Sequence, residues 1–228
     1  MTYISEFSGD FSPKDAVALT ADTIPPQSIY TRYGKRALDV SLILIFSPFI
    51  LALVLAAAFA IRLEGGSVFF VQKRLGKDGR VFPLLKLRTM VENAEERLEA
   101  YLAENPEARV EWETNQKLRN DPRITRVGNI LRRTSLDELP QMWNVLTGDM
   151  SLVGPRPMTV EQGPLYPGRT YYLVRPGISG PWQVSDRHES AFTARAIFDA
   201  VYVREMSFSN DLRILVRTVT VVLRCTGL

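Results

Sequence analysis

The feature that most constrains the fold is an uncharged apolar run at residues 40–61, VSLILIFSPFILALVLAAAFAI. About 20 apolar residues are enough for a helix to cross the hydrocarbon core of a bilayer. These 22 residues therefore predict a membrane-inserted helix. A core helix of a soluble domain is the weaker alternative, because the run is long for one.

A straight spanning helix is only one of two interpretations of this run. Pro48 lies about a third of the way along it, where proline removes one backbone hydrogen bond and bends a helix, and the hydroxyl of Ser47 can pair with a freed backbone group. Basic residues flank both ends, whereas a spanning helix carries its positive excess on one side. They are Arg32, Lys35 and Arg36 before the run and Arg62, Lys73, Arg74 and Lys77 after it. From the residues alone, a re-entrant hairpin and a single span are about equally supported.

Charge and residue counts exclude several classes of function. The net charge of +3 and the pI of about 9.1 favour phosphates or an anionic membrane only mildly, and do not indicate nucleic acid. One cysteine, Cys225, and one histidine, His188, exclude an internal disulfide and a Cys/His zinc cluster. P-loop, G-x-G-x-x-G and G-x-S-x-G motifs are absent. Carboxylates, lysines and arginines must therefore carry any catalysis, and we interpret His188 as a surface residue.

Residues 67–87 predict a β-hairpin. Two runs of β-branched, aromatic and aliphatic residues flank a turn at Asp78-Gly79. Lys86 and Arg88 then lie on one face of the second strand, because side chains alternate along a strand. Two such cations form either a solvated edge or a phosphate clamp, and the pattern alone favours the edge.

The residues with the clearest chemistry lie between positions 120 and 157. A basic run leads into two adjacent carboxylates, Asp137 and Glu138. Its members are Arg123, Arg126, Arg132 and Arg133. Cations around a carboxylate pair suit a site that handles a phosphate and a metal together.

The same stretch also fits an ordinary helix cap. Thr134 and Ser135 followed by two acids match a capping pattern, and we expect a helix from about Asp137 to Gly148. Pro140 is tolerated within its first turn. Plain capping is the commoner meaning of this pattern, but a helix N-terminus also binds anions, so the two interpretations are compatible.

Helices are also predicted on both sides of this stretch. The acidic residues 92–113 form two helices divided at Asn105-Pro106, and residues 193–206 and 211–224 form two more. Arginines on one stripe of the last helix slightly favour a place at the membrane interface over packing on the core.

Residues 148–181 are rich in glycine and proline and predict structured loops. Within them Arg156 lies between Pro155 and Pro157, which restrain its backbone. A restrained arginine suits a phosphate contact and a rigid exposed turn about equally.

Three motifs in order, RRTSLDELPQMWNV, GDMSLVGPRP and RPGISGPWQV, resemble the bacterial sugar transferase family, the monotopic polyprenyl-phosphate phosphoglycosyl transferases. Matching features extend from Lys35 to about Val222. Members of the family use a helix-break-helix at a Ser-Pro pair, so the resemblance favours a re-entrant hairpin broken at Ser47 and Pro48. A departure from the family pattern is Pro181-Trp182, where relatives commonly carry leucine and a small residue.

Residues and resemblance together predict an α+β fold that is predominantly helical with a small β-hairpin. The resemblance implies a monotopic membrane protein with interfacial amphipathic helices, at the cytoplasmic face of the bacterial inner (plasma) membrane. We expect three parts: a mobile N-terminal arm at residues 1–31, a re-entrant membrane hairpin at 32–63 and a cytosolic catalytic domain at 64–228.

The resemblance also implies an activity. Family members transfer a sugar 1-phosphate from a UDP-sugar to polyprenyl (undecaprenyl) phosphate, require Mg²⁺, release UMP and begin the assembly of exopolysaccharide or another surface glycan. By resemblance, Asp137 is the nucleophile of a covalent aspartyl phosphosugar and a Mg²⁺ ligand, and Glu138 is its partner. The implied contacts to substrate phosphates and nucleotide are Lys86, Arg88, Arg133 and Arg156.

Several points stay open. A homo-oligomer and contacts with downstream glycosyltransferases are compatible with the sequence, and galactose, glucose and N-acetylated hexoses all remain candidate sugars. A catalytically silent membrane-anchored scaffold is the main alternative, although both acids are present. An ordinary glycosyl transferase that releases UDP is less favoured, because the chain has no Asp-x-Asp motif.

Overall fold

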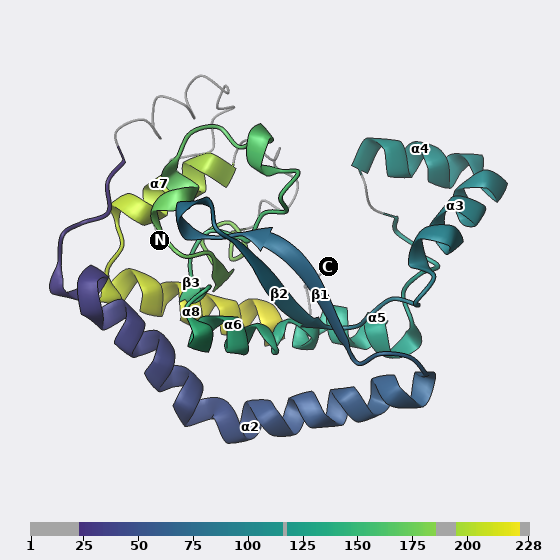
Figure 1. Cartoon of the computed structure of the whole chain (residues 1–228), viewed down its shortest axis with the longest axis horizontal. Coiled ribbons are helices and arrows are strands. Elements are labelled where there is room, and N and C mark those ends of the chain that lie inside the picture. The colour runs from purple at the N-terminus through teal and green to yellow at the C-terminus, as the bar shows by residue number, and fades with distance from the viewer. Residues whose placement is uncertain (1–22, 116–117, 186–194, 224–228) are drawn as a thin grey trace.

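The structure is a computed structural model that describes residues 23–115, 118–185 and 195–223 (Figure 1). A long apolar helix leads this part of the chain. After a short π-helical turn, η2 (Tyr30–Gly34), helix α2 (Lys35–Glu64) continues through Pro48, and Figure 1 shows that it bends near its middle. Pro48 lacks the N–H that would reach the carbonyl of Leu44, and the hydroxyl of Ser47 donates to that carbonyl at 2.8 Å. The predicted break is thus a bend within one helix, and Ser47 replaces the lost bond.

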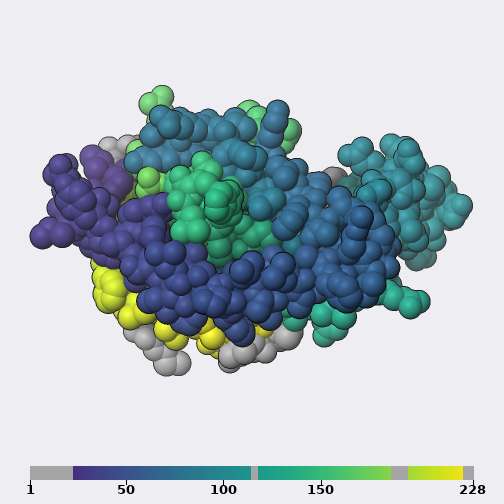
Figure 2. Space-filling model, turned by 60° about the horizontal axis from the view of Figure 1, so that its bottom comes forward, coloured from purple at the N-terminus to yellow at the C-terminus, as the bar shows by residue number. Residues whose placement is uncertain are grey.

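Helix α2 carries a large apolar surface. Among the described residues it belongs to the one segment, Tyr30–Glu64, that is long and apolar enough to cross a membrane, and only 11% of its most apolar window is buried. Figure 2 shows the helix lying across one face of the molecule. Its most exposed large side chains are Leu44, Ile45, Phe46, Phe49, Leu51, Leu55, Phe59 and Leu63. An exposed apolar surface of this extent supports the predicted membrane insertion.

The predicted β-hairpin is confirmed. Strands β1 (Phe69–Leu75) and β2 (Val81–Leu87) pair antiparallel, with Phe70 opposite Lys86. The turn between them contains η3 (Lys77–Gly79), in which Asp78 has φ +57° and Gly79 has φ +75°. An aspartate and a glycine are residues that tolerate this left-handed conformation.

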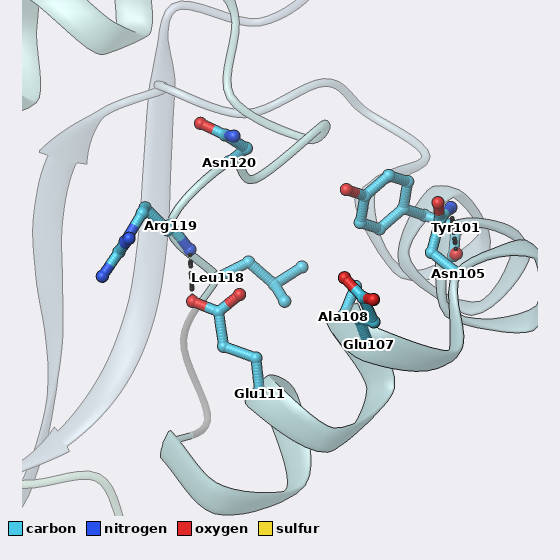
Figure 3. Close-up of a pocket in the computed structure, with 8 residues that line it drawn as sticks. All are labelled: Tyr101, Asn105, Glu107, Ala108, Glu111, Leu118, Arg119 and Asn120. Carbon is cyan, nitrogen blue, oxygen red and sulfur yellow. Dashed lines mark hydrogen bonds between the residues drawn. The ribbon is translucent and has the colours of Figure 1, made fainter.

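Two acidic helices extend away from the rest of the fold (Figure 1). They are α3 (Ala94–Glu104) and α4 (Pro106–Asn115), and they divide at Asn105-Pro106 as predicted. With residues 118–120 they surround a polar cavity of about 400 Å³, in which a Glu111 carboxylate oxygen accepts the backbone N–H of Arg119 at 2.8 Å (Figure 3). The residues that line this cavity include none of the predicted site residues.

The remaining elements follow in chain order. They are α5 (Arg126–Arg133), η4 (Leu136–Glu138), α6 (Gln141–Thr147), β3 (Ser151–Val153), η5 (Gly163–Leu165), η6 (Thr170–Leu173), β4 (Gly177–Ser179), α7 (Arg195–Arg204) and α8 (Phe208–Leu223). The predicted helix at Asp137 begins later, at Gln141, because a 3-10 turn holds both acids first. It ends at Gly148, with φ +91°, as predicted. Strands β3 and β4 form a short parallel pair in a region where only loops were predicted.

A buried carboxylate joins the start of α2 to the C-terminal helices. Asp211 of α8 has no exposed surface. It accepts hydrogen bonds from Lys35 Nζ at 2.6 Å, from the Tyr30 hydroxyl at 2.5 Å and from the Tyr202 hydroxyl at 2.9 Å. The predicted N-terminal arm lies outside the described residues up to position 22, and Tyr30 near its end is held in this junction.

A second buried carboxylate joins α2 to the strand that precedes the Gly154-to-Pro157 loop. Asp39 accepts the hydroxyl of Ser151 at 2.7 Å and the backbone N–H of Leu152 at 3.2 Å. The largest hydrophobic cluster lies around the same junction, and its members include Ile43, Phe82, Leu84, Val145, Met150, Val153, Tyr202, Val203 and Ile214. The described fold is thus mostly helical with a small antiparallel sheet, as predicted.

Candidate active site

The two adjacent acids lie in a tight turn between α5 and α6. Ser135 has φ +56° and reverses the chain after α5, and residues Leu136–Glu138 form η4. Asp137 is only 8% exposed, and the side chain of Glu138 is 24% exposed. Two carboxylates with so little water around them need cations nearby to remain ionised.

Lys86 provides one such cation. Its Nζ lies 2.7 Å from Glu138 Oε1 and 3.7 Å from Asp137 Oδ2. Lys86 is the residue before the last in β2 and lies on the side of that strand that faces η4. The structure therefore brings together three residues that the sequence analysis selected from two distant segments.

The surroundings shift the two acids in opposite directions. Burial raises the pKa of the Asp137 carboxyl, and Glu138 adds to this, although Lys86 and Arg132 oppose it. Burial also acts to raise the pKa of Glu138, but Lys86, Arg156 and Arg74 outweigh it and hold that pKa below its usual range. Glu138 is thus the firmly ionised partner, and Asp137 is the less solvated carboxylate.

Arg132 is a site residue that the sequence analysis did not select. Its Nε donates to Thr89 Oγ1 at 2.9 Å, and burial lowers its pKa, while the charge of Asp137 raises it. Arg133, which was selected, lies on the exposed side of α5. Arg132 lies four residues after Gly128, which packs against the Thr89 backbone, so it is the packing of α5 that turns Arg132 toward the site.

Arg88 and Lys86 have different partners in this structure, Glu92 and Glu138, and the expected phosphate clamp stays a prediction. Strand β2 ends at Leu87, although the backbone N–H of Arg88 still donates to the carbonyl of Val68 at 2.9 Å. Its guanidinium donates to Glu92 at 2.8 Å and to the carbonyl of Gly65, and only 10% of the side chain is exposed. In this structure Arg88 stabilises the turn between α2 and β1.

Arg156 lies in the loop after β3 and is exposed. Its positive charge helps to keep Glu138 ionised and acts on Arg74 as well. Arg74 donates to the carbonyl of Pro157 at 3.1 Å, and among the described residues its buried Nε has no hydrogen-bond partner. Arg74 therefore both holds the loop that carries Arg156 and adds positive charge beside the acids.

Glycines allow this loop to pack tightly against the segment around β4. The backbone N–H of Gly154 donates to Ser179 at 2.9 Å, and that of Gly177 donates to Pro155 at 2.8 Å. A Cβ on Gly154 would lie 2.4 Å from the carbonyl oxygen of Arg175, and a Cβ on Gly177 would lie 2.1 Å from the nitrogen of Gly154. Only glycines permit this close approach of the two backbones, and the approach fixes the position of the loop that carries Arg156.

The two acids can contribute to a Mg²⁺ site but cannot enclose one. Among residues 23–115, 118–185 and 195–223, no three His, Cys, Asp or Glu side chains are grouped to hold a metal. Mg²⁺ commonly uses one or two protein carboxylates and completes its shell with water and substrate phosphates. Asp137 and Glu138 fit such a shared site. His188 lies outside the described residues.

The chain has long matches to known proteins. It is 44% identical over 203 residues to the undecaprenyl-phosphate galactose phosphotransferase of Salmonella typhimurium, covering 86% of this chain and 42% of that protein. It is 38% identical over 205 residues to the UDP-glucose:undecaprenyl-phosphate glucose-1-phosphate transferase of Escherichia coli, covering 85% and 41%. It is 41% identical over 200 residues to the exopolysaccharide production protein ExoY of Rhizobium meliloti, covering 85% and 87%.

The chain thus spans less than half the length of two of these relatives and most of the third. Its residues 30–225 match the bacterial sugar transferase family. That match includes α2, the hairpin, both acids and the loops around β3 and β4. The chain belongs to the bacterial sugar transferase family.

Proposed function

We propose that this chain transfers a sugar 1-phosphate from a UDP-sugar to undecaprenyl phosphate, giving undecaprenyl diphosphate sugar and UMP. The observation that carries the proposal is the buried carboxylate of Asp137, beside the Lys86–Glu138 ion pair and near Arg132. The names of the relatives support it, since they specify undecaprenyl phosphate and galactose or glucose. The product would begin the assembly of an exopolysaccharide or another surface glycan.

The chemistry follows from an ionised carboxylate with little water around it. An oxygen of Asp137 attacks the phosphorus that bears the sugar, the bond from that phosphorus to the bridging oxygen breaks, and UMP leaves. An oxygen of the lipid phosphate then attacks the same phosphorus, and the bond to Asp137 breaks to restore the carboxylate. No histidine is needed, because an aspartate is already ionised near neutral pH.

The cations around the acids match the charge that this reaction develops. Lys86 and Arg132 act on Asp137, and Arg156 and Arg74 act on Glu138. Fixed cations in a poorly solvated site stabilise a phosphoryl group in transfer. Asp137 and Glu138 would hold Mg²⁺, which when bound neutralises charge on phosphate oxygens.

Product identity tests the proposal. Purified full-length protein is incubated with Mg²⁺, undecaprenyl phosphate and a panel of UDP-sugars that includes galactose, glucose and N-acetylated hexoses, and UMP and UDP are quantified. We expect UMP together with a lipid diphosphate sugar. UDP as the product would indicate an ordinary glycosyl transferase, and no nucleotide release from any donor would favour a scaffold.

We also propose that α2 enters and leaves the cytoplasmic leaflet of the bacterial inner membrane as a re-entrant helix. The bend at Pro48, the Ser47 hydroxyl on the carbonyl of Leu44 and the basic residues at both ends support this topology. A shallow helix would hold the acids near lipid headgroups, where a soluble donor meets a lipid acceptor. The UDP-sugar and the lipid phosphate would then reach the acids on the same face of the protein and at the same leaflet of the membrane.

Pro48→Ala is expected to shift the protein toward a spanning topology. The substitution restores the N–H that can reach the carbonyl of Leu44, so a straight helix no longer leaves that carbonyl dependent on Ser47. Tags at the two termini, probed for accessibility from each side of the membrane, measure the fraction with ends on opposite sides. Pro106→Ala, in the first turn of α4, is the matched control, and an unchanged topology for Pro48→Ala would count against the re-entrant helix.

Arg132→Ala is expected to lower kcat/KM for the UDP-sugar by roughly 10²-fold, because it removes a fixed cation beside Asp137. It should also move the acid limb of the pH–rate profile to higher pH. Arg132 lowers the pKa of Asp137, so its loss raises that pKa, and the reactive carboxylate is then lost at a higher pH as the solution is acidified. The matched change Arg133→Ala should have the smaller effect on both quantities, and the reverse order would assign the role to Arg133.

A further inference from the structure

Trp182 brings two arginines from separate segments to one aromatic ring. The Cζ atom of Arg195 lies 4.2 Å from the ring centroid, and that of Arg156 lies 6.0 Å from it. Both distances are within the range of cation–π attraction. The indole is only 9% exposed, and such attractions are stronger where water is partly excluded.

The parallel strand pair explains why Trp182 and Arg156 meet. Val153 of β3 lies opposite Ser179 of β4. Arg156 follows Val153 by three residues, and Trp182 follows Ser179 by three, so both residues lie just beyond the same end of the pair. The close packing of Gly154 on Gly177 keeps the two loops together.

The neighbouring charges oppose a fixed place for Arg156. Burial lowers the pKa of Arg74, and the charge of Arg156 lowers it further. The same two causes, in the same order, lower the pKa of Arg195 to about 10. An exposed arginine repelled by two others would turn toward solvent unless something held it.

An indole ring is suited to hold such a residue. A carboxylate close to Arg156 would also hold it but would cancel its charge, whereas an aromatic face attracts a guanidinium and leaves the charge available to an anion. Arg156 helps to lower the pKa of Glu138, but the Oε1 atom of Glu138 is already paired with Lys86 Nζ at 2.7 Å. The positive charge of Arg156 therefore remains available beside the acids.

We propose that Trp182 is a positioning residue that holds the Arg156 guanidinium against the repulsion of Arg74 and Arg195 and keeps it directed toward the diphosphate of the UDP-sugar. This inference rests on the proposed function for the identity of the anion. It adds a residue that touches no reacting atom and acts through Arg156. It also gives a role to the Pro181-Trp182 pair, which departs from the family pattern.

The test is a set of binding titrations with UDP and Mg²⁺ on full-length protein. Trp182→Leu keeps an apolar side chain but removes the aromatic face, and it is expected to weaken UDP binding about 5- to 30-fold. Trp182→Phe keeps an aromatic ring and should recover most of that loss. The matched control is Trp112→Leu in α4, which removes an aromatic ring whose centroid lies 4.9 Å from Arg123 Cζ. This variant should leave UDP binding unchanged.

Repeating the titration in a protein that carries Arg156→Ala tells whether Trp182 acts by positioning Arg156 or only by packing. If Trp182 acts through Arg156, Trp182→Leu should weaken UDP binding little in a protein that already carries Arg156→Ala. The same fold-loss in both backgrounds, or a Trp182→Phe protein as impaired as Trp182→Leu, would overturn the proposal. Turnover should show a raised KM for the UDP-sugar with a smaller change in kcat, and a loss confined to kcat would also contradict it.

Two further readouts keep the test interpretable. If Trp182→Leu does not fold, as judged from its melting temperature, Trp182→Met replaces it in the two Arg156 backgrounds: a loss seen only with Arg156 present supports the proposal, and an equal loss in both overturns it. A wild-type protein that binds UDP but releases no UMP from any UDP-sugar would refute the proposed function, while the binding comparison would still decide the role of Trp182.

Discussion

Asp137→Asn is expected to reduce UMP release from a UDP-sugar by roughly 10⁴-fold or more, because an amide cannot replace a carboxylate as the nucleophile. Asparagine has nearly the same shape, so the turn at η4 and the packing around it should persist. The rate is measured as UMP released per enzyme in the presence of Mg²⁺ and undecaprenyl phosphate. A second measurement omits the lipid and follows labelled sugar phosphate on the protein, which the wild type should retain and the variant should not.

The matched control for this change is Asp78→Asn. Asp78 is exposed in the hairpin turn with φ +57°, a conformation that asparagine also tolerates. Activity and labelling should both remain at the wild-type level. If Asp137→Asn still labels, the covalent acid is another residue, and Glu138→Gln is then the variant to compare.

Asp211→Ala is expected to lower the free energy of unfolding by about 3–5 kcal/mol, because it leaves the ammonium group of Lys35 largely buried without its partner. The hydroxyls of Tyr30 and Tyr202 lose the same acceptor. Thermal or denaturant unfolding in detergent measures the change. Because Asp211 joins α8 and α7 to the start of α2, the loss should also release the first turn of α2, which hydrogen exchange of its backbone would detect.

Replacing both Lys35 and Asp211 distinguishes the cost of an unpaired buried charge from the cost of lost side-chain volume. Lys35→Met with Asp211→Leu removes both charges, so the double variant should be more stable than Asp211→Ala alone. Glu205→Gln, in an exposed pair with Arg204 at 3.8 Å, is the control and should change stability by less than about 0.5 kcal/mol. A loss of that size for Asp211→Ala would mean that the junction contributes little to holding α2 in place.

Local patterns in the sequence were sufficient for the elements that depend on neighbouring residues. The hairpin at residues 69–87, the division of two acidic helices at Asn105-Pro106 and the end of α6 at Gly148 are all confirmed. In each case a proline or a left-handed turn residue acts on bonds only a few positions away. A bond from the Ser47 hydroxyl to a backbone group freed by Pro48 was predicted for the same reason, and the structure shows it on the carbonyl of Leu44, three residues away.

Contacts between distant segments were not predictable in this way. The β3–β4 pair depends on glycines 23 positions apart, Gly154 and Gly177, whose backbones touch. Strand alternation placed Arg88 beside Lys86, but the folded chain pairs Arg88 with Glu92 and Lys86 with Glu138. Arg133 was preferred to Arg132 because adjacent arginines look alike in a sequence, and only the packing of α5 on Thr89 distinguishes them.

The sequence by itself determined the family, the apolar helix with its bend, the β-hairpin and the pair of acids, because motif order, hydrophobic length and turn residues are properties of short segments. The tertiary structure decided which cations reach those acids and which acids instead hold the fold together. Asp39 and Asp211 are at least as buried as Asp137, yet they hold α2 against the rest of the fold. No local sequence pattern separates these two acids from Asp137. The charge and hydrogen-bond partners of a carboxylate come from residues distant in sequence, and only the folded chain brings those residues together.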